Sequence, residues 1–404
     1  MGHKRFGLRL FLPLLLVLLA AAVLITWRLT YRDARKTLEE KYSTLMSGMT
    51  SENEVSRQIY IADGIIRSKS IAEPDTETAT RLAMRAYVQS FGDPYAYYLS
   101  PEEYAKTRLD EDAVQTFVGA VFLDGRVSDG LLVAGVYDET PAAYAGLQSG
   151  DTVVAVNDSD VYTLGLVRAR GLLDGTLDGA VKITVKKADG EKCDMTLERV
   201  PRNQPSAVGS PIGDDVGLIR ILEFTDTTAA DFKNAVETLA KRGIQRYVLD
   251  LRGNPGGSLA GTLETLDFLL PEGELALVAD AVGSVTGNKM SDTDAFLAPM
   301  TVITDGFTAS TAELFAAVLK EYCRVTTVGG TTYGKGRIQE TVSLSDGGAI
   351  LISSAEYRTP AGVSFEGVGV TPDIPAEPQP DTADAVLDAA IAAVLELPLD
   401  NTEI

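Results

Sequence analysis

The strongest constraint on the fold is an alternation of apolar strands and amphipathic helices between residues 216 and 372 of this 404-residue chain. Continuous apolar runs such as Tyr247–Leu251 predict strands that are buried on both faces. Strands separated by helices in this way predict a mostly parallel sheet with helices on both of its faces. The sequence therefore predicts an α/β domain whose site lies where strands end in loops, at their carboxyl ends. The strands are expected at 216–222, 246–251 and 300–305, and the helices at 228–243, 258–270 and 312–322.

A second, β-rich module is predicted from residue 114 to residue 200, where short apolar runs with strand-like spacing replace the longer helices. Two segments between the runs, 140–151 and 165–175, predict a short and a longer helix. Residues 201–211 hold three prolines and few apolar side chains, so they predict a linker to the α/β domain. The expected strands are 116–123, 130–137, 151–157, 180–187 and 193–200.

The N-terminal part begins with nine residues and then an uncharged run, Leu10–Trp27, of 18 residues. This run is just long enough to cross a bilayer as a helix, and Trp27 suits the interface. A cleaved signal peptide is the alternative, since three alanines at 20–22 could host a cleavage site. The apolar run continues past those alanines, which favours a transmembrane anchor at 10–27 followed by a polar, helical region at 28–113.

The composition excludes several classes of function. The single histidine, His3, lies before the apolar run, so no histidine-based catalytic triad or zinc site is available in the globular part. A net charge of −21 argues against nucleic acid as a partner, because binding phosphates needs clustered Lys and Arg. Cys193 and Cys323 could form at most one disulfide, and two small buried hydrophobic residues are the expected interpretation.

Two loops of the α/β domain hold candidate catalytic groups. Three glycines in the loop 252–257 would let backbone N–H groups point at a developing negative charge, although Asn-Pro-Gly is also ordinary turn sequence. In the second loop, Ser310 precedes a helix and fits a capping box with Glu313. A serine at a helix start also gains from the helix dipole as a nucleophile. Both interpretations of Ser310 stay open on this segment alone.

A lysine between glycines, Lys335, follows these loops. To act as a base it must be neutral, so burial would have to lower its pKa from about 10.4 to about 7. Gln339 stands four residues later, which would place it on the same face of one strand as Lys335.

Three motifs in this order resemble the carboxy-terminal processing proteases, serine peptidases that use a serine-lysine dyad. They are "LDLRGNPGG" at 249–257, "DGFTASTAELFAAVLKEY" at 305–322 and "GGTTYGKGRIQ" at 329–339. Upstream, the segment beginning Asp93-Pro94-Tyr95 is similar to the segment that precedes the PDZ domain in this family. "TPAAYAGLQSGDTVVAVND" resembles a PDZ helix and strand. This chain has Thr308 and Ala312 where the family commonly has serines, and one glycine in the carboxylate loop where many PDZ domains have two.

The resemblance implies a ClpP/crotonase-like protease core at 201–373, a PDZ domain at 114–200, and a C-terminal linker and helix at 374–404. It implies Ser310 as nucleophile, Lys335 as base and Gln339 as its hydrogen-bond partner, and no metal or organic cofactor. The N–H groups of Gly256 and Thr311 are the expected oxyanion hole. The residues expected to bind a substrate C-terminus in the PDZ domain are Val118, Gly119, Ala120 and Val121.

The resemblance also implies a topology, with residues 1–9 in the cytoplasm and the catalytic part outside it, on a single-pass membrane anchor. The expected partners are protein or peptide substrates with accessible C-termini. Two other classes stay open: a membrane-tethered PDZ adaptor with a silent protease domain, and an acyl-CoA enzyme with a comparable sheet. The sequence also leaves open whether the N-terminal helical region and the tail build a homo-oligomer.

Overall fold

The computed structural model describes residues 54–72, 75–107, 115–123, 130–176, 178–379 and 382–399. The chain divides into two compact units, 1–79 and 80–404. Within the described ranges, no helix is both long enough and apolar enough to cross a bilayer. The predicted anchor at 10–27 lies outside those ranges.

In the first unit the structure describes one helix, α2 (Glu54–Lys69), none of whose residues is buried. The helix α3 (Thr76–Gln89) runs into the second unit and is followed by β1 (Tyr97–Leu99) and α4 (Pro101–Thr107). The prediction of a helical region at 28–113 was wrong at residues Tyr97–Leu99, which form the strand β1. This strand pairs antiparallel with a strand of the α/β domain, because the apolar run Tyr97–Leu99 lies along the edge of Ala349–Leu351.

The β-rich module is a sheet in the order β3-β4-β5-β7-β8, with a short strand β6 beside β5. The helix α5 begins at Pro141, behind an N-cap threonine, and α7 follows the short helix α6. The two predicted helices and the strands from 130 to 200 are therefore confirmed, whereas the strand predicted at 116–123 is divided into β2 and β3, and β2 pairs with β9 (Val200–Pro201) instead of joining the main sheet of the module. Their bounds are β2 (Thr116–Phe117), β3 (Ala120–Leu123), β4 (Leu131–Val136), α5 (Pro141–Tyr144), β5 (Thr152–Val156), β6 (Ser159–Asp160), α6 (Val161–Leu164), α7 (Leu166–Leu173), β7 (Ala180–Lys186) and β8 (Lys192–Glu198).

The prediction of a linker at 201–211 was wrong in its second half. After β9 (Val200–Pro201), residues Ala207–Ile212 form β10, which pairs antiparallel with β11 (Val216–Ile221) at the edge of the main sheet. Pro211 is tolerated there because an edge strand can leave one side of its backbone without a partner strand. Proline content therefore misidentified an edge strand as a linker.

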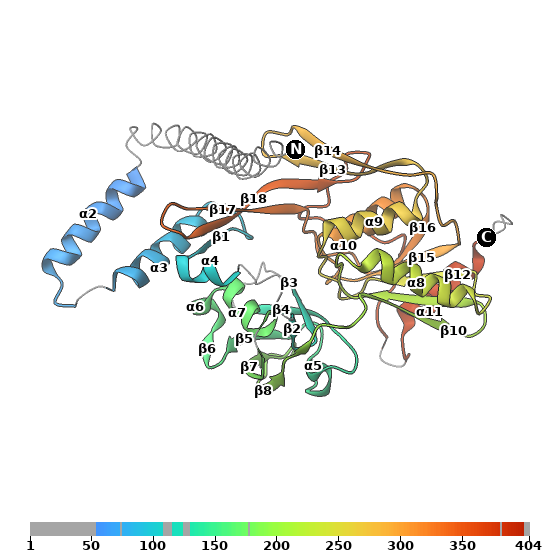
Figure 1. Cartoon of the computed structure of the whole chain (residues 1–404), viewed down its shortest axis with the longest axis horizontal. Coiled ribbons are helices and arrows are strands. Elements are labelled where there is room, and N and C mark those ends of the chain that lie inside the picture. The colour runs from blue at the N-terminus through green and yellow to red at the C-terminus, as the bar shows by residue number, and fades with distance from the viewer. Residues whose placement is uncertain are drawn as a thin grey trace, which may run out of the picture. The chain divides into compact units, whose positions relative to one another are not determined.

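The α/β domain is built on a six-stranded sheet in the order β10-β11-β12-β15-β16-β19, parallel except for β10. Alternate side chains of its strands enter two different cores: Leu249 and Val302 pack with helices α8, α9 and α10, whereas Val248 and Ile303 pack with α11. The predicted parallel sheet with helices on both faces is therefore confirmed (Figure 1). The bounds are α8 (Thr228–Ala240), β12 (Arg246–Asp250), α9 (Leu259–Leu269), β15 (Met300–Thr304), α10 (Thr311–Glu321), β16 (Val325–Gly329), β19 (Ile374–Pro375) and α11 (Ala385–Glu396).

A separate antiparallel sheet accompanies the main one and was not predicted strand by strand. It has the order β1-β18-β13-β14, with β17 paired to β18 (Figure 1). Its strands are β13 (Gly273–Asp280), β14 (Val285–Ser291), β17 (Arg337–Ser343) and β18 (Ala349–Arg358). Because β17 begins two residues after Lys335, this sheet fixes where the lysine loop ends.

Candidate active site

The loop that follows β12 is held in shape by one buried amide, Asn254. Its Nδ2 donates to the carbonyl of Ile221 at 2.9 Å, and its Oδ1 accepts from the N–H of Gly256 at 2.8 Å. The predicted use of the Gly256 N–H in an oxyanion hole therefore needs correction, because this donor is taken by Asn254 in the structure.

The N–H of the next residue, Gly257, points in another direction from that of Gly256. Phe224 donates to the carbonyl of Gly256 at 2.9 Å and accepts from the N–H of Ser258 at 2.7 Å, so it bridges to Gly257 as a parallel neighbour. In such a bridge the central residue directs its own N–H away from the partner strand. The N–H of Gly257 therefore points to the side opposite Phe224, and Gly257 lines the same cavity as Ser310.

The nucleophile loop is tied to the glycine loop through Asp305, at the end of β15. Its Oδ1 accepts from the N–H groups of Gly253, Phe307 and Thr308, at 3.1, 3.0 and 2.9 Å. Burial raises the pKa of Asp305, and these hydrogen bonds oppose that rise. The hydroxyl of Thr308 also donates to the carbonyl of Leu251 at 2.9 Å. Both loops at the carboxyl ends of β12 and β15 are thus fixed to each other.

Ser310 stands at the start of α10 in an unusual conformation, with φ 58° and ψ −124°. A non-glycine residue in this region costs of order 1–3 kcal/mol and persists only where the surroundings enforce it. The predicted capping box with Glu313 is present, because the carboxylate of Glu313 accepts from the N–H of Ser310 at 2.9 Å. Ser310 therefore occupies the N-cap position of α10. Its strained backbone is typical of a functional site.

Glu313 connects the serine to the lysine loop. This fully buried carboxylate accepts from the N–H groups of Ser310, Gly334 and Lys335 at 2.9, 2.7 and 2.7 Å, and from the hydroxyl of Thr332 at 2.5 Å. Burial raises the pKa of Glu313, whereas all four hydrogen bonds favour the ionised form. The sequence assigned Glu313 only to the capping box, and nothing in its spacing indicated the contacts with the lysine loop.

Replacing Glu313 with glutamine is expected to lower the free energy of unfolding by about 2–4 kcal/mol, since the new amide group would face donors that now meet a carboxylate. Urea unfolding measures the change. Glu340→Gln, at an exposed position on β17, is the matched control and should change stability by less than about 0.5 kcal/mol. A Glu313→Gln protein as stable as the control would show that the buried contacts contribute little.

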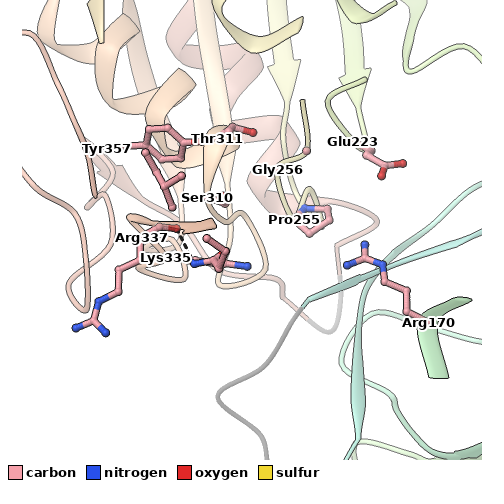
Figure 2. Close-up of a pocket in the computed structure, with 12 residues that line it drawn as sticks. Arg170, Glu223, Pro255, Gly256, Ser310, Thr311, Lys335, Arg337 and Tyr357 are labelled. Carbon is pink, nitrogen blue, oxygen red and sulfur yellow. Dashed lines mark hydrogen bonds between the residues drawn. The ribbon is translucent and has the colours of Figure 1, made fainter. Parts of the chain in front are cut away.

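A cavity of about 270 Å³ brings the two loops and the lysine together (Figure 2). Ser310, Thr311, Lys335 and Gln339 all line it, and only 8% of Lys335 is exposed. The full lining is Arg170, Glu223, Pro255, Gly256, Gly257, Ser310, Thr311, Lys335, Arg337, Ile338, Gln339 and Tyr357. Sequence reasoning missed Arg170 and Glu223, which come from the β-rich module and from the segment after β11.

The predicted arrangement of Lys335 and Gln339 on one strand was wrong. Lys335 precedes β17, whereas Gln339 lies on it, next to a register shift between Ile338 and Gln339. The Nε2 of Gln339 donates to the carbonyl of Arg337 at 3.0 Å. Gln339 therefore reaches the cavity while part of its amide supports the backbone of its own strand, and its partnership with the lysine stays a prediction.

The charges at the rim of the cavity form a half-buried cluster. Glu223 accepts from Arg202 at 2.5 Å, and the same arginine lies 3.7 Å from Asp174, at the end of α7. Burial raises the pKa of Asp174 to about 6, against the attraction of Arg202. Across the described residues, no cluster of three or more acidic, cysteine or histidine side chains suits a metal ion.

The predicted carboxylate loop lies outside the catalytic cavity, at the start of the edge strand β3. Gly119 has φ 94°, and an added Cβ would lie 2.2 Å from Thr140, so only glycine fits there. Val118 is fully buried, and its carbonyl accepts from the N–H of Ala142 at 2.9 Å. Val121 packs in a cluster with Ala309, the residue before the nucleophile candidate. The module thus contacts the catalytic loop through apolar side chains.

The two cysteines are free, so no disulfide joins them. The expectation that both are buried hydrophobic residues was wrong for Cys323, which is exposed, while Cys193 is half-buried. Cys323 lies just past the end of α10 with φ 53°, a position where a helix terminates toward solvent.

Comparisons with known proteins agree with this geometry. Residues 215–376 match the model of peptidase family S41, and residues 132–187 match a PDZ domain. The chain is 30% identical to the chloroplastic C-terminal processing peptidase of Tetradesmus obliquus, over 76% of this chain and 69% of that one. It is also 30% identical to carboxyl-terminal-processing peptidase 2 of Arabidopsis thaliana, over 74% of this chain but only 61% of the relative.

A solved structure described as a photosystem II D1 C-terminal processing protease has the same fold, with a TM-score of 0.65 and 27% identity. The match covers 82% of this chain and 90% of that one, so it includes the β-rich module as well as the α/β domain. This chain therefore belongs to peptidase family S41, as a serine peptidase of the carboxy-terminal processing type with a PDZ domain.

Proposed function

We propose that this chain is a membrane-anchored endopeptidase that receives substrate C-termini in its PDZ domain and cleaves peptide bonds with Ser310 and Lys335. The observation that carries the proposal is that the strained Ser310 and the buried Lys335 line one cavity. Glu313 supports this pairing, because one carboxylate holds the backbone N–H groups of both residues.

The proposed reaction has two steps. Neutral Lys335 takes the proton of the Ser310 hydroxyl while Oγ attacks the scissile carbonyl carbon, and the protonated lysine then gives its proton to the leaving amine. Water clears the acyl-enzyme in the second step. Thr311 N–H, at the start of α10, and Gly257 N–H are the proposed oxyanion donors, each worth about 3 kcal/mol. Gln339 is proposed to help orient the lysine.

In the PDZ domain, the substrate C-terminus is proposed to bind at Val118–Val121 and to pair with the open edge of β3. The sheet order leaves this edge unpaired among the described strands, and strand addition at such an edge is a common mode of peptide recognition. The residues at 10–27 are proposed to anchor the chain in the cell membrane, with the catalytic part outside the cytoplasm.

Incubation of the purified full-length chain with an unfolded protein that has a free C-terminus is expected to yield new peptide termini by mass spectrometry. The rate should rise with pH as Lys335 becomes neutral. If the chain is instead an adaptor with a silent protease domain, the unfolded protein should bind and stay intact. Binding without cleavage at any pH, or a rate that does not change with pH, would count against the dyad.

A further inference from the structure

The segment Asp93–Tyr95, which precedes the PDZ domain, is fixed onto the sheet beside the lysine loop. Asp93 accepts from the backbone N–H of Ser353 on β18 at 2.8 Å and from its hydroxyl at 3.0 Å. Asp93 Oδ1 also accepts from the N–H of Tyr95 at 3.1 Å. Two residues later β1 begins and pairs with the same strand, β18. The turn that carries Tyr95 is therefore rigidly placed, although it lies 240 residues before the lysine in sequence.

The ring of Tyr95 lies against the amine of Lys335. The distance from Nζ to the ring centroid is 5.0 Å, within the range of a cation–π contact. Both side chains are buried, with 6% of Tyr95 and 8% of Lys335 exposed. Such contacts strengthen when both partners are removed from water. The ring therefore stabilises the charged ammonium of Lys335 much more than its neutral amine.

We propose that Tyr95 is a positioning residue for the general base, whose ring face orients Lys335 and stabilises the ammonium that forms when Ser310 is deprotonated. This inference rests on the proposed function. The proton moves from Ser310 Oγ to Lys335 Nζ as the bond from Oγ to the carbonyl carbon forms. It leaves Nζ for the departing amine as the C–N bond breaks. Positive charge is thus present on Nζ during the step in which the barrier is crossed.

Other charged groups surround the lysine and are unchanged by substitutions at Tyr95. Glu313 holds the Lys335 N–H, Glu366 accepts from the next N–H at 2.8 Å, and Arg337 lies 3.4 Å from Glu366. The charged side chains around the cavity and its walls include Asp93, Arg170, Arg202, Glu223, Glu313, Arg337 and Glu366, with Asp174 beside Arg202. A comparison among variants at Tyr95 alone therefore isolates the contribution of the ring.

The test is the pH dependence of cleavage of an unfolded protein by the full-length chain carrying Tyr95→Leu or Tyr95→Phe. Without the ring the ammonium is less stable, so Lys335 loses its proton at lower pH. In Tyr95→Leu the midpoint of the rising limb is expected to move down by about 0.5–1.5 pH units. The plateau at high pH should fall by about 2- to 30-fold, because the ammonium formed during reaction is also less stable. Tyr95→Phe keeps the ring and should keep the wild-type midpoint.

If Tyr95 had a purely structural role, Tyr95→Leu would lower the plateau rate without moving the midpoint of the pH profile. That result in a folded Tyr95→Leu protein would overturn the inference. If this variant does not fold, Tyr95 can be replaced with phenylalanine that carries one to three fluorines on its ring. Each fluorine weakens the attraction between the ring face and a cation while the shape of the ring stays nearly constant. The midpoint should then fall with each added fluorine, and an unchanged midpoint across that series would equally overturn the inference. Cleavage that persists in Ser310→Ala or Lys335→Ala would instead contradict the proposed function itself.

Discussion

Replacing Ser310 with alanine is expected to lower the rate of peptide-bond cleavage by on the order of 10⁴-fold or more, since no other nucleophile is proposed for the cavity. Lys335→Ala should have an effect of the same order, because the serine hydroxyl is then left without its base. The double variant should be no slower than either single variant, because residues that act as a unit lose their function together. Cleavage is measured as new termini released from an unfolded protein.

Two exposed residues outside the cavity provide the control for the dyad variants. Ser159→Ala and Lys192→Ala remove a serine hydroxyl and a lysine amine at solvent-facing positions of the PDZ domain. Both variants should cleave the unfolded protein at the wild-type rate. Thermal unfolding of all five proteins separates lost chemistry from lost structure. A folded Ser310→Ala or Lys335→Ala protein with wild-type activity would exclude the dyad mechanism.

The architecture could be predicted because its strands and helices are specified by local patterns. Runs such as Tyr247–Leu251 are apolar except for Asp250, and this is sufficient to place them in the centre of a parallel sheet covered on both faces. Edge strands carry a weaker signal, because only part of each is buried. For this reason β10 was predicted as a linker, and β1 was hidden within a region predicted to be helical.

The candidate catalytic residues were predictable from the sequence, whereas the lining residues Arg170 and Glu223 and the hydrogen bonds of the site were not. The resemblance of three motifs to the carboxy-terminal processing proteases was enough to predict that Ser310 and Lys335 would be near each other, and the structure places both around one cavity. The partner of the Gly256 N–H depends on how the Asn254 side chain folds back, which no sequence spacing specifies. The contact between Tyr95 and Lys335 joins residues 240 positions apart, which are brought together by the pairing of β1 with β18 and by the hydrogen bonds of Ser353 to Asp93.

Gly256→Ala is expected to lower kcat by about 10²- to 10³-fold. A Cβ at this glycine would lie 2.9 Å from the backbone nitrogen of Thr311, a proposed oxyanion donor, and 2.9 Å from the Cβ of Ser310. Either the methyl group fills the space that the oxyanion would occupy, or the nucleophile loop moves away. Losing one such donor costs about the same factor in other serine proteases. The measurement is kcat for the unfolded protein substrate, together with urea unfolding.

Gly362→Ala is the matched control for this prediction. Gly362 has φ 81°, close to the 95° of Gly256, so both substitutions carry a similar backbone strain of about 1–2 kcal/mol. An added Cβ at Gly362 meets no atom within 4 Å, whereas at Gly256 it meets the catalytic loop. Gly362→Ala should therefore lose stability while it keeps its kcat, and Gly256→Ala should lose both. Equal kcat values for the two variants would show that Gly256 is required only for its backbone conformation and that the oxyanion site lies elsewhere in the cavity.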